Sequence, residues 1–182
     1  MKSNNRPRVY IGGPFLFKYA EFSEENIKKD FRYSFVGDPF IEQTGPSVAI
    51  GEVDYVGPFY YYKRGLGPSD VVAAEIEAIK DATHVFLVFP DGVDAPGTLA
   101  ELVFAATELK HIDVYYEKSI RKTEVDSTAV GLDGQIHHPY WYPFLQAKAI
   151  NPQIRFHECE SATAARDACL DELQRLSRGV AR

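Results

Sequence analysis

The apolar run Val85-Phe86-Leu87-Val88-Phe89 constrains the fold more than any other stretch of the chain. A short apolar run bounded by turn residues is typical of a buried strand. The turn-like stretch 91–94 follows it, and a helical apolar pattern then extends from Thr98 to Leu109. The segment therefore predicts a strand–turn–helix unit, in which Glu101 lies near the start of the helix.

The remainder of the chain continues this alternation of strands and helices. Ser23, Ser69 and Ser161 are the expected helix N-caps. We expect an α/β fold with a small Rossmann-like or flavodoxin-like, doubly wound, mainly parallel sheet of four to five strands. Further strands are predicted at 8–11, 47–50, 112–116 and 153–157, and further helices at 23–35, 69–81 and 161–178.

A length of 182 residues predicts a single domain, 1–182. The long polar segment 117–140 is predicted to be a loop or an insertion. The segment 54–68, rich in tyrosine, glycine and proline, is predicted to be a loop. It is either a lid or subunit contact, or a loop fixed to the body by aromatic packing. A short apolar stretch extends from Trp141 to Ile150.

Composition limits the classes of partner. The net charge of −6 argues against a broad nucleic-acid-binding surface. No apolar run approaches the roughly 20 residues needed to span a bilayer, and no signal peptide is visible, so we expect a soluble, cytoplasmic protein. Neither the cysteine pair Cys159 and Cys169 nor His137-His138 has metal-ligand spacing. We therefore expect no metal and no cofactor.

Glu101 is the first candidate functional residue. Open α/β sheets bind ligands at the carboxyl ends of their strands, where the predicted unit places this residue. A carboxylate in the first turn of a helix is also favoured by the helix dipole, which helps to keep it ionised. Such a group serves as a nucleophile, a base or a cation stabiliser. The alternative is a glutamate that merely decorates a helix start.

Two glycine-containing turns provide further candidates. Gly12 and Gly13 follow the first strand, in the stretch Y-I-G-G-P-F, and allow close approach of a ligand to the backbone. The spacing matches neither the dinucleotide fingerprint nor a P-loop. Tyr10 either reaches into the crevice or fills the sheet edge. In the second turn Gly97 allows close approach, and Thr98 is expected to cap the helix, whose free N–H groups suit a hydroxyl or a phosphate.

Four motifs together resemble the nucleoside 2-deoxyribosyltransferase family. They are Y-I-G-G-P-F, an acid-bearing helix followed by I-K-D-A, an apolar strand ending in P-D, and D-x-P-G-T-x-x-E-L. The family includes nucleoside transferases and related nucleotide N-glycosidases such as cytidylate hydrolases. The resemblance covers Tyr10 to Ala105 and, more loosely, Trp141 to Ile150. It implies cleavage or transfer at the N-glycosidic bond of a small-molecule nucleoside or nucleotide, and a homodimer or larger homo-oligomer.

The resemblance also implies roles for individual residues. Glu101 is the nucleophile that captures the anomeric carbon as a covalent glycosyl-enzyme. Tyr10 orients that carboxylate, and Glu75 protonates or holds the base. Gln146 is the nearest match to an asparagine that some members donate to the neighbouring subunit's site. The expected substrate-binding residues are Gly12, Gly13, Pro14, Phe15, Asp91, Asp94, Gly97, Thr98 and Gln146.

The sequence departs from the family pattern at two further positions. Six residues before the nucleophile, nucleoside members have an acid and nucleotide members have serine, whereas this chain has Ala95. The neighbouring Asp94 favours a substrate without phosphate. Val103 replaces a glycine of the family's helix, which affects helix packing rather than chemistry.

Two alternatives stay open at this point. The first is a phosphoribohydrolase resembling the cytokinin-activating type, whose P-G-G-x-G-T-x-x-E motif also lies on a strand-to-helix turn. G-T-L-A-E-L fits that motif, although 93–96 replace its doubled glycine. The second is a catalytically inactive nucleotide-binding or interaction module on the same fold.

Overall fold

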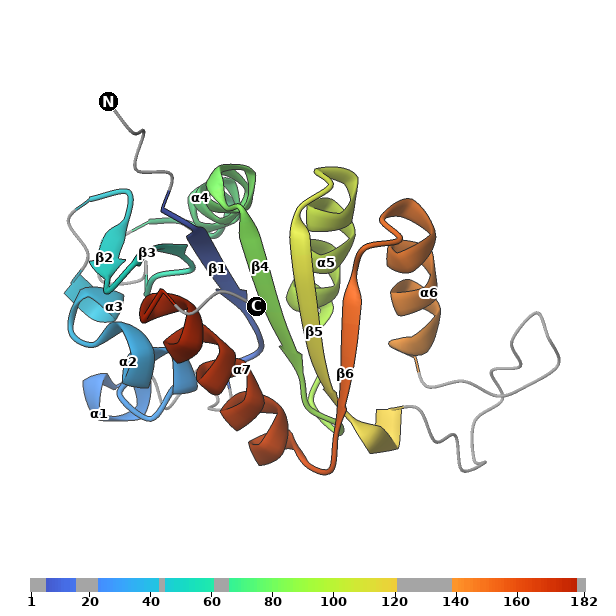
Figure 1. The fold of residues 1–182 in the computed structure, drawn as a ribbon. Coiled ribbons are helices and arrows are strands. Elements are labelled where there is room, and N and C mark those ends of the chain that lie inside the picture. Colours follow the sequence, from blue (N-terminus) through green and yellow to red (C-terminus); the bar gives the residue numbers. More distant parts are fainter. Residues whose placement is uncertain (1–5, 16–22, 43–44, 61–65, 121–138, 180–182) are drawn as a thin grey trace, which may run out of the picture.

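A six-stranded sheet forms the centre of the molecule (Figure 1). The computed structural model describes residues 6–15, 23–42, 45–60, 66–120 and 139–179. The strand order is β2-β3-β1-β4-β5-β6, and every neighbouring pair is parallel except β2–β3. The predicted mainly parallel α/β sheet is confirmed, with one strand more than the upper expectation. The strands are β1 Arg8–Gly12, β2 Val48–Ile50, β3 Val53–Gly57, β4 His84–Phe89, β5 His111–Glu117 and β6 Arg155–Cys159.

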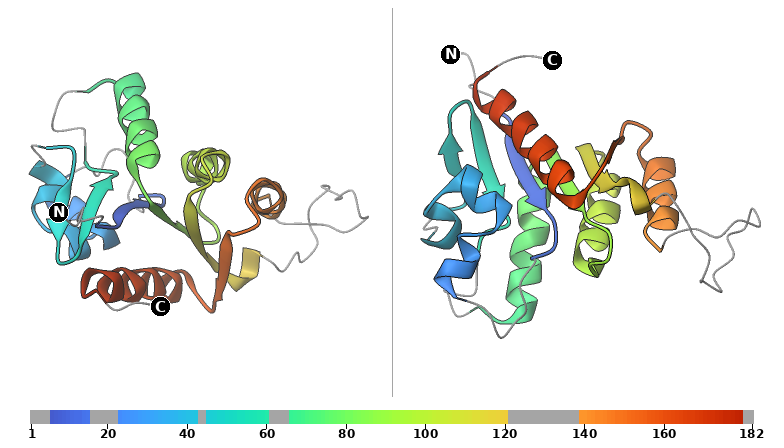
Figure 2. Two further views of the ribbon diagram at one scale, coloured as in Figure 1. Left: turned by 45° about the horizontal axis from the view of Figure 1, so that its top comes forward. Right: turned by 90° about the horizontal axis from the view of Figure 1, so that it is seen from below.

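Helices cover both faces of this sheet (Figure 2). On one face lie α4 (Pro68–Asp81), α5 (Pro96–Thr107) and α6 (Trp141–Ile150). Side chains such as Ile79, Leu102 and Phe144 pack there against apolar residues of β4 and β5. The other face carries α1 (Glu24–Ile27), α2 (Phe31–Val36), α3 (Pro39–Glu42) and α7 (Ala162–Ser177). The burial of β4 from both sides explains its uninterrupted apolar sequence.

Strand β3 corrects the prediction of a loop over 54–68. Tyr55 and Val56 are fully or almost fully buried, and β3 pairs with β1. The strand is short and ends at Gly57-Pro58, so turn residues dominated its sequence pattern. Phe59 and Tyr60 are buried as well. Aromatic packing therefore accounts for the described part of this segment, and 61–65 lie outside the described residues.

The predicted helix 23–35 is wrong as a single helix. It is interrupted where the Asp30 side chain accepts a hydrogen bond from the backbone N–H of Arg32 and caps a new helix, α2. Ser23 and Ser161 are confirmed as N-caps. Ser69 is not a cap, because α4 begins at Pro68 after Gly67. Proline favours the first helical position, where its missing N–H is of no consequence.

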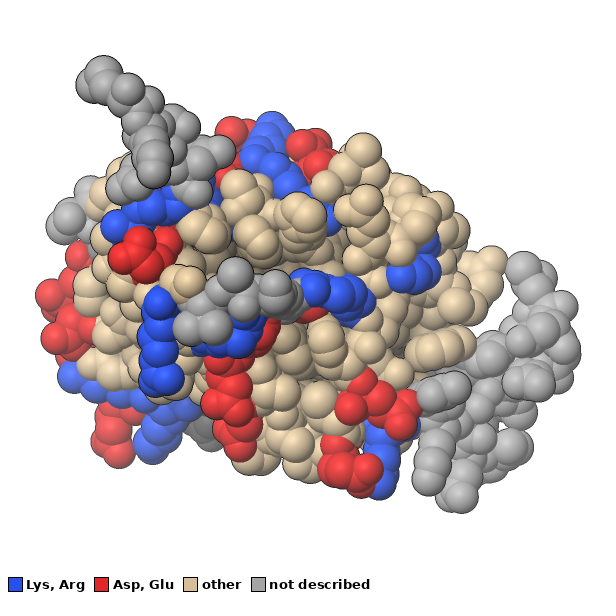
Figure 3. Space-filling model, viewed as in Figure 1, with Lys and Arg blue, Asp and Glu red and all other residues tan. Residues whose placement is uncertain are grey.

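The segment 117–140 is structured at both ends. Glu117 completes β5, Lys118–Ile120 form a short 3-10 helix, and Tyr140 precedes α6. Residues 121–138 lie outside the described ones. None of the described helices is both long enough and apolar enough to cross a membrane. On the face that carries α7, acidic and basic side chains are interspersed rather than gathered by sign (Figure 3).

Candidate functional site

The strand order reverses between β1 and β4. The chain passes from β1 outward to β3 on one side, and from β4 outward to β5 and β6 on the other. Setting aside the antiparallel edge strand β2, this is the flavodoxin-like order, in which ligands bind at the carboxyl ends of the strands beside the reversal. Tyr10 and Gly12 belong to β1, and Glu101 belongs to the helix that follows β4. The topology thus brings these three residues to the expected ligand crevice.

Helix α5 begins two residues earlier than predicted. Its first residue is Pro96 and its N-cap is Ala95, with no side-chain capping bond, so Thr98 is not the cap. Thr98 is instead buried in the first turn. Glu101 consequently lies in the second turn, and no acidic residue occupies the first turn. The expectation that the helix dipole keeps Glu101 ionised is wrong, because the dipole acts within the first turn.

The Glu101 carboxylate is fixed from two sides. The phenol of Tyr10 donates a hydrogen bond to Glu101 Oε1 at 2.7 Å. Gly12 lies against the other oxygen: a Cβ atom at this position would overlap both Glu101 Oε2 and the Leu87 side chain. The absence of a side chain at Gly12 therefore makes the space that the carboxylate occupies. By contrast, a Cβ at Gly97 would meet nothing within 4 Å.

Glu101 Oε2 is a buried polar atom without a hydrogen-bond partner among the described residues. Such atoms are rare in native proteins, because an unsatisfied buried acceptor costs on the order of 1–3 kcal/mol. The residue as a whole is only partly buried, so the carboxylate lies at the margin of the interior. An oriented carboxylate with one unused oxygen is the arrangement expected of a reactive group rather than a structural one.

The surroundings of Glu101 also change its acidity. Burial raises its pKa to about 7, with the charge of Glu75 adding to the effect, while the Tyr10 hydrogen bond and the charge of Arg32 oppose it. Burial likewise raises the pKa of Glu75. Burial and the charges of Glu101 and Glu75 raise the pKa of Tyr10 well above its ordinary value, so this phenol stays protonated and donates. Burial thus raises the pKa of both carboxyl groups near Tyr10, and that of Glu101 the more strongly.

The loop between β4 and α5 is held by residues that the sequence did not point to. The Tyr140 hydroxyl accepts a hydrogen bond from the Ala95 backbone N–H at 2.8 Å and donates one to the Val93 carbonyl. Glu117 Oε2 accepts from the Asp91 backbone N–H at 3.1 Å. These contacts join residues far apart in the chain, and no local sequence signal reports them.

The other predicted substrate-binding residues lie in varied environments. Phe15 packs against Phe40 and Tyr60 in the core on the α2 side. Asp94 and Gly97 are exposed. Gln146 is exposed on α6, where it does not contribute to the crevice of its own chain in the described contacts. Partly exposed positions are occupied by Gly13, Pro14 and Asp91.

The sequence analysis also missed a buried ion pair beside the Gly12-Gly13 turn. Arg32 is 1% exposed, and its guanidinium donates to both oxygens of Asp30 at 2.7 and 2.8 Å. It donates a third hydrogen bond to the Gly13 carbonyl at 3.0 Å. In the sequence Arg32 falls within a predicted helix, where an arginine is ordinarily a surface residue.

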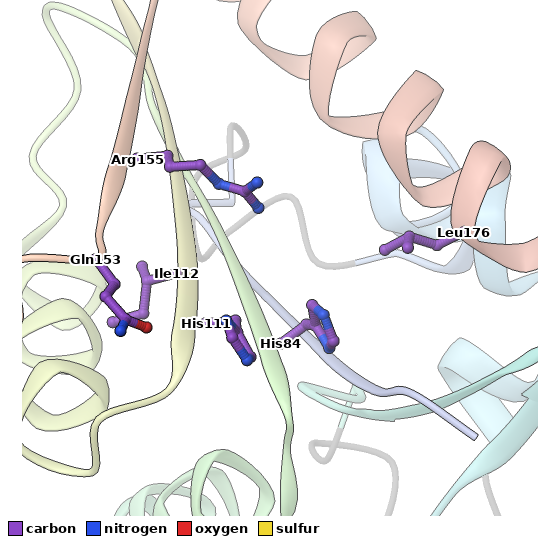
Figure 4. A pocket seen from close by; sticks show the side chains of 6 residues that line it. All are labelled: His84, His111, Ile112, Gln153, Arg155 and Leu176. Atoms are coloured by element: carbon purple, nitrogen blue, oxygen red, sulfur yellow. The ribbon is translucent and has the colours of Figure 1, made fainter. Parts of the chain in front are cut away.

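A separate cavity of about 380 Å³ lies at the opposite, amino-terminal ends of the strands. Arg155 and Leu176 point toward one another across it, with His84 and His111 side by side (Figure 4). The charge of Arg155 is offset by Asp113 at 2.5 Å. Burial and His111 lower the pKa of His84, so this imidazole is neutral at neutral pH. Because it lies at the amino-terminal ends of the strands, this cavity is distinct from the Glu101 site.

The sequence matches no protein-family model and no curated protein. Among solved structures, the fold is similar to that of the CMP N-glycosidase BcmB of Clostridium botulinum. The TM-score is 0.48 and the sequence identity 14%, over 91% of this chain and 98% of that one. The candidate site is therefore defined by the contacts of Glu101 with Tyr10 and Gly12.

Proposed function

We propose that this protein cleaves or transfers at the N-glycosidic bond of a nucleoside or nucleotide through a covalent glycosyl-Glu101 intermediate. The observation that carries the proposal is the buried Oε2 of Glu101, which has no hydrogen-bond partner in the described part of the chain and lies against Gly12, while Tyr10 holds the other oxygen. The motifs Y-I-G-G-P-F and D-x-P-G-T-x-x-E-L, which resemble those of the nucleoside 2-deoxyribosyltransferase family, support the same assignment.

The first step is attack of Glu101 Oε2 on the anomeric carbon of the sugar. A C–O bond to Glu101 forms as the C–N bond to the base breaks, and the electron pair of that bond leaves with the base. The developing oxocarbenium charge is stabilised by the carboxylate. Tyr10 keeps Oε1 occupied, so the nucleophilic oxygen is defined.

Glu75 supplies the proton that the departing base requires. Its raised pKa keeps it protonated at a higher pH than an ordinary glutamate. We assign the proton to Glu75 and the negative charge to Glu101 in the substrate complex, because acid-assisted glycosidic cleavage needs a carboxylic acid beside a carboxylate. In the second step water, or a second base, attacks the anomeric carbon from the face the first base left. The Glu101 ester bond breaks, and Glu75 recovers a proton from the attacking group.

We assign the substrate contacts to the edges of this crevice. Gly12 and Gly13 underlie the sugar and base, with Pro14 and Phe15 continuing the turn. Asp94, exposed on the β4–α5 loop, binds the sugar's 5′ oxygen, which favours a nucleoside over a nucleotide. Asp91, Gly97 and Thr98 complete that side.

The assembly we propose is a homodimer or larger homo-oligomer that uses α6. This helix exposes Tyr142, Leu145 and Ile150, with Gln146 among them. Packing of these apolar side chains against a neighbouring subunit would bring Gln146 toward that subunit's crevice. Light scattering after size exclusion tests the assembly, and Leu145→Glu is expected to shift it toward monomer.

The decisive experiment is base release from a panel of nucleosides and nucleotides, followed by liquid chromatography. Wild type is expected to release base from at least one member, and Glu101→Ala to release none. A substrate with fluorine at the 2′ position of the sugar slows breakdown of the glycosyl-enzyme. It is expected to leave a sugar adduct on the Glu101 peptide in mass spectrometry. Addition of a second free base distinguishes transfer from hydrolysis.

Two outcomes would contradict this proposal. If wild type binds a nucleotide and yet releases no base, the protein is a binding module on this fold. If Glu101→Ala keeps wild-type turnover, Glu101 is not the nucleophile.

A further inference from the structure

Beneath the Gly12-Gly13 turn lies a buried cation. The Arg32 guanidinium is surrounded by aromatic rings, with its central carbon 4.4 Å from the Phe15 ring centroid and 5.3 Å from that of Phe31. Asp30 holds it in a bidentate ion pair, and its remaining hydrogen bond in the described contacts goes to the Gly13 carbonyl.

This cation is permanently charged. Burial alone would lower the pKa of Arg32, but the charge and hydrogen bonds of Asp30 raise it further than burial lowers it. An arginine is rarely buried unless its charge is paired and its donors are used. Asp30 alone could balance the charge of Arg32. The additional hydrogen bond to the Gly13 carbonyl therefore links Arg32 to the Gly12-Gly13 turn.

The turn in question forms the floor of the candidate site. Gly13 directly follows Gly12, which lies against Glu101 Oε2. A shift of the turn by a fraction of an ångström would therefore move the surface on which the carboxylate rests. Such misplacement is costly for catalysis, since about 1 Å can reduce a rate on the order of 100-fold.

We propose that Arg32 is a positioning residue of the Glu101 site, holding the Gly12-Gly13 turn through the Gly13 carbonyl and presenting a fixed positive charge to the carboxyl groups of the crevice. The proposal rests on the proposed glycosidic function. It adds a residue of α2, on the opposite face of the sheet from α5, to the groups that govern Glu101.

Three side chains in the described residues act on the ionisation of Glu101. The groups that act on Glu101 are Tyr10 from β1, Glu75 from α4 and Arg32 from α2. Arg32 is the cation in this set, and its charge also opposes the rise in the pKa of Glu75. Loss of the charge is therefore expected to make both carboxyl groups harder to ionise.

The test compares Arg32→Gln and Arg32→Lys with the control Arg175→Gln. The control removes the same charge from a pair with Glu172 on α7. Two quantities are measured: the pH dependence of kcat and KM for base release, and the titration of the Glu101 carboxyl by carbon-13 NMR, assigned with Glu101→Gln. Thermal denaturation shows which variants are folded.

Arg32→Gln is expected to raise the Glu101 titration midpoint, and the acidic limb of kcat with it, by about 0.5–1 pH unit. Its kcat should fall about tenfold or more, with KM within about threefold. Arg32→Lys keeps the charge but not the fork of donors, so it should preserve the midpoint while lowering kcat. Arg175→Gln should change neither.

A folded Arg32→Gln variant with an unchanged Glu101 midpoint and unchanged kcat would overturn the proposal. So would failure of both Arg32 variants to fold at low temperature, since Arg32 would then serve the stability of the fold. If wild type releases no base from any substrate, the proposed function fails. The NMR titration still decides whether Arg32 acts on Glu101, so the two failures are distinguishable.

Discussion

Two acids of this protein, the partly buried Glu101 and the buried Asp113, have opposite environments. Asp113 is 1% exposed on β5, and each of its oxygens has a nitrogen partner: Arg155 at 2.5 Å and His157 at 2.7 Å. Glu101 has a phenol on one oxygen and no described partner on the other. A carboxylate with both oxygens paired contributes to the fold, whereas one with an unused oxygen is available for chemistry. This contrast separates a structural acid on β5 from a candidate catalytic one on α5.

Exchange of each acid for its amide gives the largest expected effect. Glu101→Gln should lower the rate of base release by about 10³-fold or more, because the amide cannot capture the sugar. Asp113→Asn should keep the rate within about threefold of wild type, because Asp113 belongs to the opposite end of the sheet. Initial rates measured by liquid chromatography compare the two variants. Equal losses in both would remove the distinction between the two acids.

The second prediction concerns the floor beneath Glu101. Gly12→Ala places a methyl group where the Glu101 carboxylate and the Leu87 side chain now lie. We expect a loss of rate of about 100-fold, because the nucleophile is displaced. Gly45→Ala is the matched control, since a Cβ at that position makes only an ordinary contact, 3.9 Å from the Ser47 carbonyl oxygen. A Gly12→Ala variant with wild-type kcat would show that the close contact is dispensable.

Replacement of the two acids should affect stability in the opposite order to catalytic rate, with the larger effect at Asp113. Asp113→Ala should reduce the free energy of unfolding by about 1–3 kcal/mol, because it removes two hydrogen bonds whose partners, Arg155 and His157, are partly exposed to solvent. Glu101→Ala should cost less, since one oxygen of Glu101 has no hydrogen-bond partner among the residues that the structure describes. Urea denaturation at pH 7 measures both values. Should Glu101→Ala prove the more destabilising, Glu101 would have to be regarded as a structural acid.

The smallest expected effect is a pH-dependent gain of stability. Burial raises the pKa of Glu101 from 4.5 to about 7, so the folded protein holds this proton more tightly than the unfolded chain. The folded state therefore loses stability as the pH rises from 4.5 to 7. Glu101→Gln removes that loss and should stabilise the protein by about 1–3 kcal/mol at pH 8. At pH 4, where the proton is bound in both states, denaturation curves of variant and wild type should converge.

The sequence predicted the parts of the molecule that depend on neighbouring residues. The apolar strand β4, the helix bearing Glu101 and the Gly12-Gly13 turn all follow from local patterns. The failures have physical causes. Pro96 starts α5 early and so places Glu101 beyond the reach of the helix dipole, and the turn residues after β3 obscured that strand.

The groups that hold the site in place were beyond sequence reasoning. Arg32 contacts the Gly13 carbonyl across 19 positions of the chain, and Tyr140 reaches the Ala95 amide across 45. An arginine in a helix and a tyrosine in a polar stretch have no local feature that reports such contacts. Only the folded chain brings them to the crevice.

Glu117 and Tyr140 have a consequence for how this chain can vary. Glu117 ends β5 and Tyr140 precedes α6, and both residues bind the backbone of the same loop ahead of α5. The described residues on either side of the interval therefore converge on one loop and fix the backbone that leads into the helix of Glu101. A change at Glu117 or Tyr140 would reach Glu101 through this loop, although neither residue lies near it in the sequence.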